Sequence, residues 1–244
     1  MEGYRRPALP RKVARQLRQE AGFGCARCGH PYVEYHHIIP WAKEQHFRPE
    51  DMIAVCSNCH VAISKLGRDT QREFKAKPYN IANGRAKGAL EYDKSDLCFK
   101  IGGNWYEDTR VILRLCNTPL ISCRLEQGQA MISVLMLDET LHQILVIEDN
   151  EITFRTDDLW DFEYAHNYVV ARSAPRDLAL LVDFRGDEAT IEGKFQVGNQ
   201  KVELGPDATT LPGGNMFVGN RMRGVGVAFQ LEDENLTLPV RCRI

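Results

Sequence analysis

The sequence has no long apolar run: no stretch approaches the roughly 20 consecutive apolar residues that a helix needs to cross a bilayer. Residues 1–7 contain two arginines that no apolar stretch follows, so they do not have the pattern of a secretory signal. These two absences predict a cytoplasmic protein with no membrane partner. Because thiols stay reduced in that compartment, paired cysteines are expected to bind metal rather than to form disulfides.

Strong net charge is also absent, since the 244 residues carry a formal charge of only −2. This balance conceals two halves of opposite sign. Residues 1–90 hold 16 Lys and Arg against 8 Asp and Glu, and residues 91–244 hold 15 against 25. A solvated charged face is the plainer interpretation of charge alone, but a basic half beside metal-binding motifs indicates an approach to nucleic acid.

Two C-x-x-C pairs lie in the basic half, with histidines between and after them. Thiolate sulfurs are soft ligands that close tetrahedral zinc sites, so a structural Zn²⁺ is expected, and so small a domain is expected to need it to fold. The predicted zinc ligands are Cys25, Cys28, Cys56 and Cys59. The imidazoles of His36, His37 and His60 are left for a harder cation, Mg²⁺ or Mn²⁺, with a phosphate oxygen. That combination favours cleavage of phosphodiester bonds.

Periodicity in the first half predicts short elements around these motifs. Apolar residues at four-residue spacing predict a helix over 10–21, and apolar runs predict strands over 33–38 and 52–55. Ser57 is a suitable cap for a helix over 58–66. The polar stretch 67–95 is interpreted as a short basic helix followed by a linker.

From residue 97 onward, runs rich in Val, Ile, Leu and Phe recur about every 8–12 residues between turn signals, which is typical of an all-β domain. The clearest runs are 111–115, 131–137, 144–147, 168–171, 178–184 and 225–231. Because no clean repeat is visible, a sandwich is favoured over a compact solenoid. The expected fold class is α+β. Its predicted parts are a metal-bound domain at 1–75, a basic linker at 76–97 and an all-β domain at 98–244.

On these motifs, the segment 11–67 resembles the HNH, or ββα-metal, endonucleases in their four-cysteine form. The matching text is C-A-R-C-G at 25–29, E-Y-H-H-I-I-P-W at 34–41 and E-D-M-I-A-V-C-S-N-C-H at 50–60. The resemblance implies that His36 and His60 bind a divalent cation at the scissile phosphate. It also implies that His37 is the general base that takes a proton from the attacking water.

This sequence departs from the family pattern at two positions. Asp51 takes the place of the middle asparagine, and Ser64 stands where some members carry a further histidine. Asp51 is expected to orient an imidazole or to fix the loop. Three basic side chains are candidates for contact with flanking phosphates: Arg27, Lys65 and Arg68. The likeness covers about a quarter of the chain.

We therefore expect a metal-dependent endonuclease that cuts DNA, with double-stranded DNA favoured. The β domain is expected to sense a ligand, recruit a protein partner or drive self-association, and by analogy the layout suits bacterial defence or a mobile element. An alternative from another class is a zinc-stabilised DNA-binding adaptor without catalysis, which Asp51 and Ser64 favour. RNA also stays open as a substrate, because metal-assisted hydrolysis neither requires nor forbids a 2′-hydroxyl.

Overall fold

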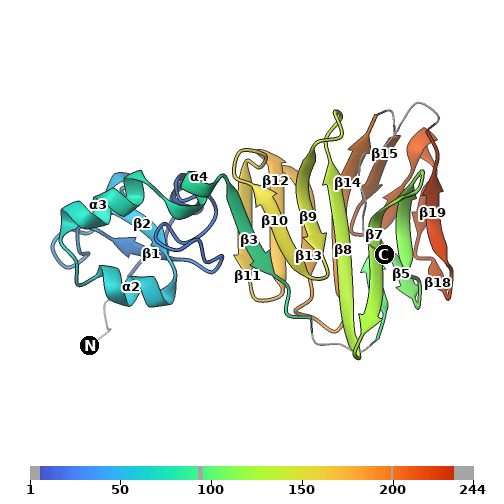
Figure 1. Cartoon of the computed structure of the whole chain (residues 1–244), viewed down its shortest axis with the longest axis horizontal. Helices are drawn as coiled ribbons and strands as arrows, with labels where there is room; N and C mark the ends of the chain where they lie inside the picture. The colour runs from blue at the N-terminus through green and yellow to red at the C-terminus, as the bar shows by residue number, and fades with distance from the viewer. Residues whose placement is uncertain (1–5, 93–95, 199, 234–244) are drawn as a thin grey trace. The chain divides into compact units, whose positions relative to one another are not determined.

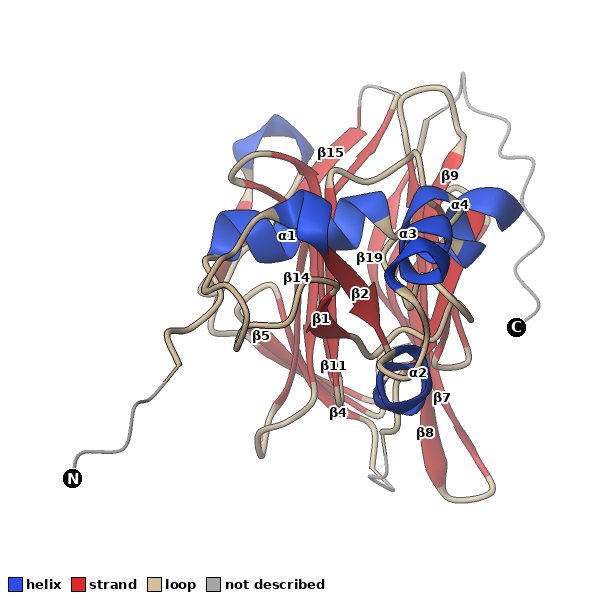
Figure 2. Ribbon diagram, turned by 90° about the vertical axis from the view of Figure 1, so that its left-hand side faces the viewer, coloured by secondary structure: helices blue, strands red, loops and turns tan. Residues whose placement is uncertain are grey.

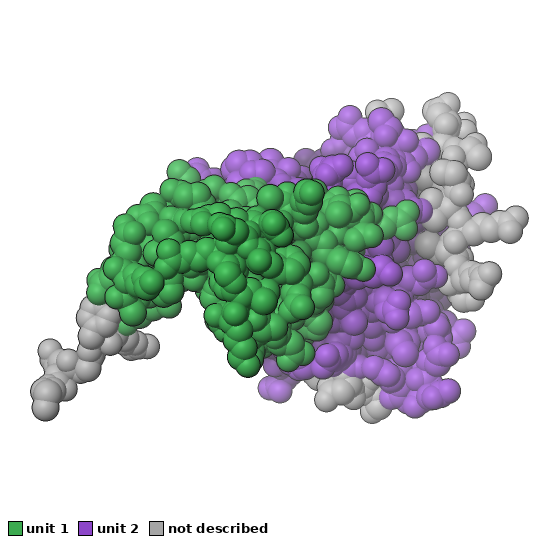
Figure 3. All heavy atoms as spheres, turned by 60° about the vertical axis from the view of Figure 1, so that its left-hand side comes forward, with its two compact units in different colours: residues 1–86 green, residues 87–244 purple. Residues whose placement is uncertain are grey.

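The computed structural model describes residues 6–92, 96–198 and 200–233. The chain divides into two compact units, residues 1–86 and 87–244, which are coloured separately in Figure 3. Helices are concentrated in unit 1 and strands in unit 2, as Figure 1 shows, so the α+β prediction is confirmed. Within the described ranges, no helix has both the length and the apolar character needed to span a membrane.

Unit 1 is built around a short antiparallel hairpin with helices beside it (Figure 2). Its elements are α1 (Arg11–Glu20), β1 (Glu34–His37), η1 (Pro49–Asp51), β2 (Met52–Val55), α2 (Ser57–Ile63), α3 (Arg68–Ala76) and α4 (Tyr79–Asn83). The order of helix, strand, strand and helix is the one that the sequence predicts. Ser57 begins α2 without capping it, because its hydroxyl donates instead to Glu34 Oε1 at 2.5 Å.

The core of unit 1 joins apolar side chains and thiols in one buried cluster. Leu17 from α1, Ile53 from β2 and Ile63 from α2 are almost fully buried in it. Cys25, Cys56 and Cys59 belong to the same cluster. The predicted zinc ligands are therefore part of the core, so a metal bound there would tie the hairpin to both of its flanking segments.

The stretch 76–97, expected to be a linker, contains helix α4 and strand β3 (Arg85–Ala89). Asn80 on α4 is 3% exposed, and its Nδ2 donates to the Gly22 carbonyl at 2.9 Å. The Tyr79 amide donates to the Ala26 carbonyl at 2.8 Å. Because these partners lie more than 50 residues earlier in the chain, the local sequence gives no sign of them.

Unit 2 contains two large, mainly antiparallel sheets. The first has the order β19 (Val227–Leu231), β6 (Val111–Leu115), β7 (Thr118–Glu126), β8 (Gln129–Leu137), β9 (Gln143–Glu148), β10 (Glu151–Arg155) and β3. The main path of the second is β11 (Asp161–Ala165), β12 (Tyr168–Ala174), β13 (Asp177–Asp183), β14 (Ala189–Val197), β15 (Gln200–Leu204), β16 (Ala208–Thr210) and β17 (Met216–Val218). It also includes β4 (Cys98–Ile101), β5 (Asn104–Glu107) and β18 (Arg221–Arg223), and the short helix η2 (Pro212–Gly214) lies between β16 and β17.

The inner faces of the two sheets pack against each other through aromatic side chains. Phe154 on β10 and Phe162 on β11 have ring centroids 4.3 Å apart. Phe229 on β19 lies 6.3 Å from Tyr106 on β5 and 5.0 Å from Phe217 on β17, again between centroids. Both sheets are open, and they face each other as a β sandwich. Each of the apolar runs identified in the sequence overlaps a strand.

Candidate active site

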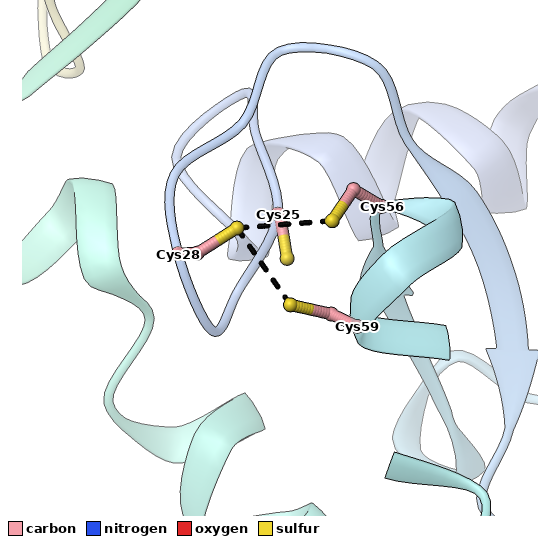
Figure 4. A group of neighbouring side chains, drawn as sticks. All are labelled: Cys25, Cys28, Cys56 and Cys59. Atoms are coloured by element: carbon pink, nitrogen blue, oxygen red, sulfur yellow. Dashed lines mark hydrogen bonds between the residues drawn. The ribbon is translucent and has the colours of Figure 1, made fainter. Parts of the chain in front are cut away.

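The four predicted zinc ligands lie together, as Figure 4 shows. Their sulfur atoms are all within 4.8 Å of one another. Cys28 Sγ lies 3.7 Å from both Cys56 Sγ and Cys59 Sγ. With Zn–S bonds of about 2.3 Å, the sulfurs of a regular tetrahedron are about 3.8 Å apart. The cluster therefore has the donor type, number and spacing that a structural Zn²⁺ requires.

A tight turn holds the first cysteine pair. The Gly29 amide donates to the Cys25 carbonyl at 2.8 Å, and Gly29 has a positive φ of 77°. A Cβ at this position would lie 2.5 Å from Asn80 Oδ1, so only glycine fits without displacement of α4. Burial raises the pKa of the Cys28 and Cys59 thiols. A bound cation is therefore what would stabilise them as thiolates.

The structure brings two of the predicted catalytic-site histidines face to edge. His36 on β1 and His60 on α2 have ring centroids 4.9 Å apart and an interplanar angle of 75°. His36 Nε2 lies 3.0 Å from Gln71 Oε1, and His60 Nδ1 lies 2.6 Å from Glu34 Oε2. Burial lowers the pKa of His36, which favours the neutral imidazole that binds metal.

His37 contacts a different set of side chains, because adjacent strand residues point to opposite faces. It is 7% exposed, and its ring centroid lies 4.9 Å from that of His46 and 5.5 Å from that of Trp41. His37 Nε2 is 2.9 Å from the His46 carbonyl oxygen. Burial lowers the pKa of His37, and the charge of Arg6 lowers it further, which favours the neutral imidazole.

Arg6 lies beside this second histidine. Its Nη2 is 2.6 Å from His37 Nδ1 and 2.9 Å from His37 Nε2. The guanidinium also lies 4.5 Å from the centroid of the Trp41 ring, a cation–π contact. The positive charge of Arg6 therefore lies beside His37, the predicted general base, on the side from which a phosphate would approach.

Asp51 contacts arginines. Its Oδ2 accepts from Arg48 Nε at 3.1 Å and its Oδ1 from Arg72 Nη2 at 3.3 Å. The Asp51 carbonyl accepts from the Ile38 amide at 2.9 Å, next to the end of β1. These contacts connect the loop before β2 to α3 and to the strand that carries the histidines.

The predicted phosphate contacts are dispersed over unit 1. Arg27 lies 5.6 Å from the centroid of the Phe74 ring, and Lys65 and Arg68 are exposed near the end of α2 and the start of α3. The sequence analysis assigned no site role to four residues that the structure places beside the histidines: Arg6, Glu34, His46 and Gln71. Glu34 alone had a local signal, because it precedes His36 by two residues and so shares its strand face.

Comparison with known proteins agrees with this geometry for one part of the chain. Residues 25–66 match the family model for HNH endonucleases. No curated protein and no solved structure matches the chain. The matched segment contains the four cysteines and His36, His37, Asp51 and His60, and it ends before the β-rich part begins. Residues 25–66 of unit 1 are therefore similar to HNH endonucleases and include a four-cysteine cluster of zinc-site type, and a β-rich remainder follows them.

Proposed function

We propose that the protein is a metal-dependent endonuclease that hydrolyses phosphodiester bonds of DNA, with double-stranded DNA favoured. The observation that carries this proposal is the pairing of His36 and His60 at 4.9 Å between ring centroids, inside the segment that matches the HNH family. The two imidazoles come from strand β1 and helix α2, which Glu34 joins through its contacts with Ser57 and His60. With water molecules to complete its coordination, a divalent cation fits such a pair of donors.

In the proposed reaction, Mg²⁺ or Mn²⁺ at His36 and His60 would supply positive charge for the scissile phosphate and the leaving 3′ oxygen. The chain itself supplies the base. Because the His46 carbonyl can only accept a hydrogen bond, His37 Nε2 carries the proton and His37 Nδ1 holds the lone pair. In the free protein Arg6 Nη2 donates to this lone pair at 2.6 Å, so Arg6 would first turn to an oxygen of the scissile phosphate. His37 Nδ1 would then take the proton of the attacking water.

Other residues of unit 1 would position the substrate. Asp51, held by Arg48 and Arg72, would fix the loop that leads from the histidine strand to β2. Arg27, Lys65 and Arg68 would bind flanking phosphates, which are recognised without regard to base sequence. The hairpin offers little surface for base readout, so we propose that the β domain controls targeting or activation through a ligand, a protein partner or self-association. A cytoplasmic role in bacterial defence or in a mobile element fits this arrangement.

Supercoiled plasmid provides the direct test of hydrolysis. The zinc-loaded protein should nick it in Mg²⁺ or Mn²⁺ and should stop when EDTA removes the added cation while the helical signal at 222 nm remains. Parallel digests of single- and double-stranded DNA and RNA would establish the substrate, and double-stranded DNA should be cut fastest. Equal persistence of every substrate in all metals would exclude the nuclease.

The second candidate function is a zinc-stabilised DNA-binding adaptor without catalysis. The pairing of Asp51 with two arginines favours it, because a carboxylate used in this way differs from the asparagine of the family pattern. Binding of duplex DNA with no cleavage in any divalent metal would support the adaptor over the nuclease.

A further inference from the structure

We propose that Gln71 and Glu34 are positioning residues that fix the tautomers of His36 and His60. Each imidazole thereby presents one set nitrogen, Nδ1 of His36 and Nε2 of His60, to a shared divalent cation. This inference rests on the proposed function and adds two residues and two ligand atoms to it.

Gln71 determines which nitrogen of His36 carries the proton. It is 5% exposed, and its Nε2 donates to the Leu66 carbonyl at 2.9 Å. Because that carbonyl can only accept, the amide orientation is fixed, and Oε1 is the atom that faces His36 Nε2 at 3.0 Å. An amide oxygen also only accepts, so His36 Nε2 must donate. In a neutral imidazole, the lone pair is then on Nδ1.

Glu34 acts in the opposite sense on His60. Its Oε2 lies 2.6 Å from His60 Nδ1, and a carboxylate can only accept there, so Nδ1 carries a proton. In the neutral imidazole, Nε2 then holds the lone pair. The second oxygen of Glu34 accepts from Ser57 Oγ at 2.5 Å. Because Ser57 and His60 are both on α2, the carboxylate is held by two contacts with that helix.

The arrangement has the form in which proteins hold metal-binding histidines. Such a histidine usually donates its other N–H to a carboxylate, a carbonyl or water, which fixes the ring and raises the basicity of the ligand nitrogen. Here the two donors come from different elements, and their acceptors come from α3 and β1. The two rings are nearly perpendicular, with centroids 4.9 Å apart, so imidazoles from two different elements lie close to each other.

The tautomers can be measured before any catalytic metal is added. In the full zinc-loaded chain with ¹⁵N-labelled histidine, long-range ¹H–¹⁵N spectra should show His36 protonated at Nε2 and His60 protonated at Nδ1. Mn²⁺ affinity, measured by titration calorimetry, should fall about 10–100-fold in Gln71→Leu and in Glu34→Ala. Glu34→Gln keeps an acceptor oxygen and should lose much less affinity than Glu34→Ala.

Gln16→Leu is the matched control, because it makes the same change on α1, where Gln16 bonds only to the exposed Glu20 in the described contacts. It should bind Mn²⁺ as the wild type does. Zinc content and the helical circular dichroism signal establish that each variant is folded. If Gln71→Leu does not fold, the wild-type spectra still decide the question.

Two results would overturn the inference: the opposite tautomer at either histidine, or wild-type Mn²⁺ affinity in folded Gln71→Leu and Glu34→Ala. A different result would contradict the proposed function. If the tautomers and affinities are as expected and the wild type nicks no DNA in any metal, the positioning role stands and the nuclease does not.

Discussion

Removal of the zinc ion should unfold unit 1 and leave unit 2 intact. Three of the four sulfurs, those of Cys25, Cys56 and Cys59, belong to the buried cluster that also holds Leu17 and Ile63. Structural zinc contributes about 10–16 kcal/mol to the folding of small zinc domains at pH 7. A typical domain has only about 5–15 kcal/mol of net stability. The free energy of folding lost with the ion is therefore as large as the whole net stability expected for unit 1.

Circular dichroism can follow the two units separately. Within the described residues, α1, α2, α3 and α4 all lie in unit 1, whereas unit 2 consists of strands and one short 3₁₀ turn. A strong chelator with a thiol reagent should release one zinc per chain and abolish the helical signal at 222 nm, while the thermal transition of the β sandwich remains. Cys59→Ser should behave in the same way without chelator.

Cys98→Ser is the control, because Cys98 is on β4 of unit 2 and outside the cluster. It should keep its zinc and its helical signal. The reasoning would be refuted by a chain that has lost its zinc and yet retains the full signal at 222 nm with an unchanged first transition.

Three further predictions concern charged side chains. Asp51→Asn should lower the stability of unit 1 by about 1–2 kcal/mol in urea titrations, since it weakens two charged hydrogen bonds to arginines, and should leave nicking measurable; an inactive but folded variant would contradict this role. Arg6→Ala should slow nicking by about 10-fold or more, because it removes a charged contact to the phosphate, and should change DNA affinity little. Equal losses in rate and affinity would instead make Arg6 a general DNA contact. Hydrogen bonds from Lys194 and then Ser173 lower the pKa of Asp177, and the hydrogen bond from Arg185 lowers the pKa of Asp183. Both carboxylates therefore stabilise unit 2 at pH values above their unfolded pKa of about 3.9. This contribution is lost as the pH falls through the lower folded pKa values. The melting temperature of unit 2 should thus be level from about pH 7 to pH 5 and fall below about pH 4, and Asp183→Asn should reduce the fall.

The features that the sequence predicted well are those encoded over short distances. The C-x-x-C spacing alone brings two sulfurs together, and the apolar run 111–115 coincides with β6. The pairing of His36 with His60 follows from a motif in which a strand, a loop, a strand and a helix have set lengths. These local sequence patterns predict the structure well because they depend little on residues elsewhere in the chain.

The features that it did not predict depend on residues distant in the chain. Gln71 reaches His36 from 35 residues later, and Arg6 reaches His37 from 31 residues earlier. Asn80 fixes α4 through Gly22, so a polar stretch that resembles a linker is folded against unit 1. None of these side chains has a spacing that distinguishes it from an ordinary surface residue, and only the tertiary contacts show its role.

The rate of plasmid nicking by His37→Ala, with duplex binding measured in parallel, tests the central claim most directly. His30→Ala is the control: its imidazole lies in the cysteine loop, and the backbone bond between the Cys25 amide and the His30 carbonyl is retained. We predict a loss of about 10²–10⁴-fold in rate for His37→Ala, unchanged DNA affinity and near-normal nicking by His30→Ala. Cleavage by His37→Ala at the wild-type rate in Mg²⁺ and Mn²⁺ would contradict the account.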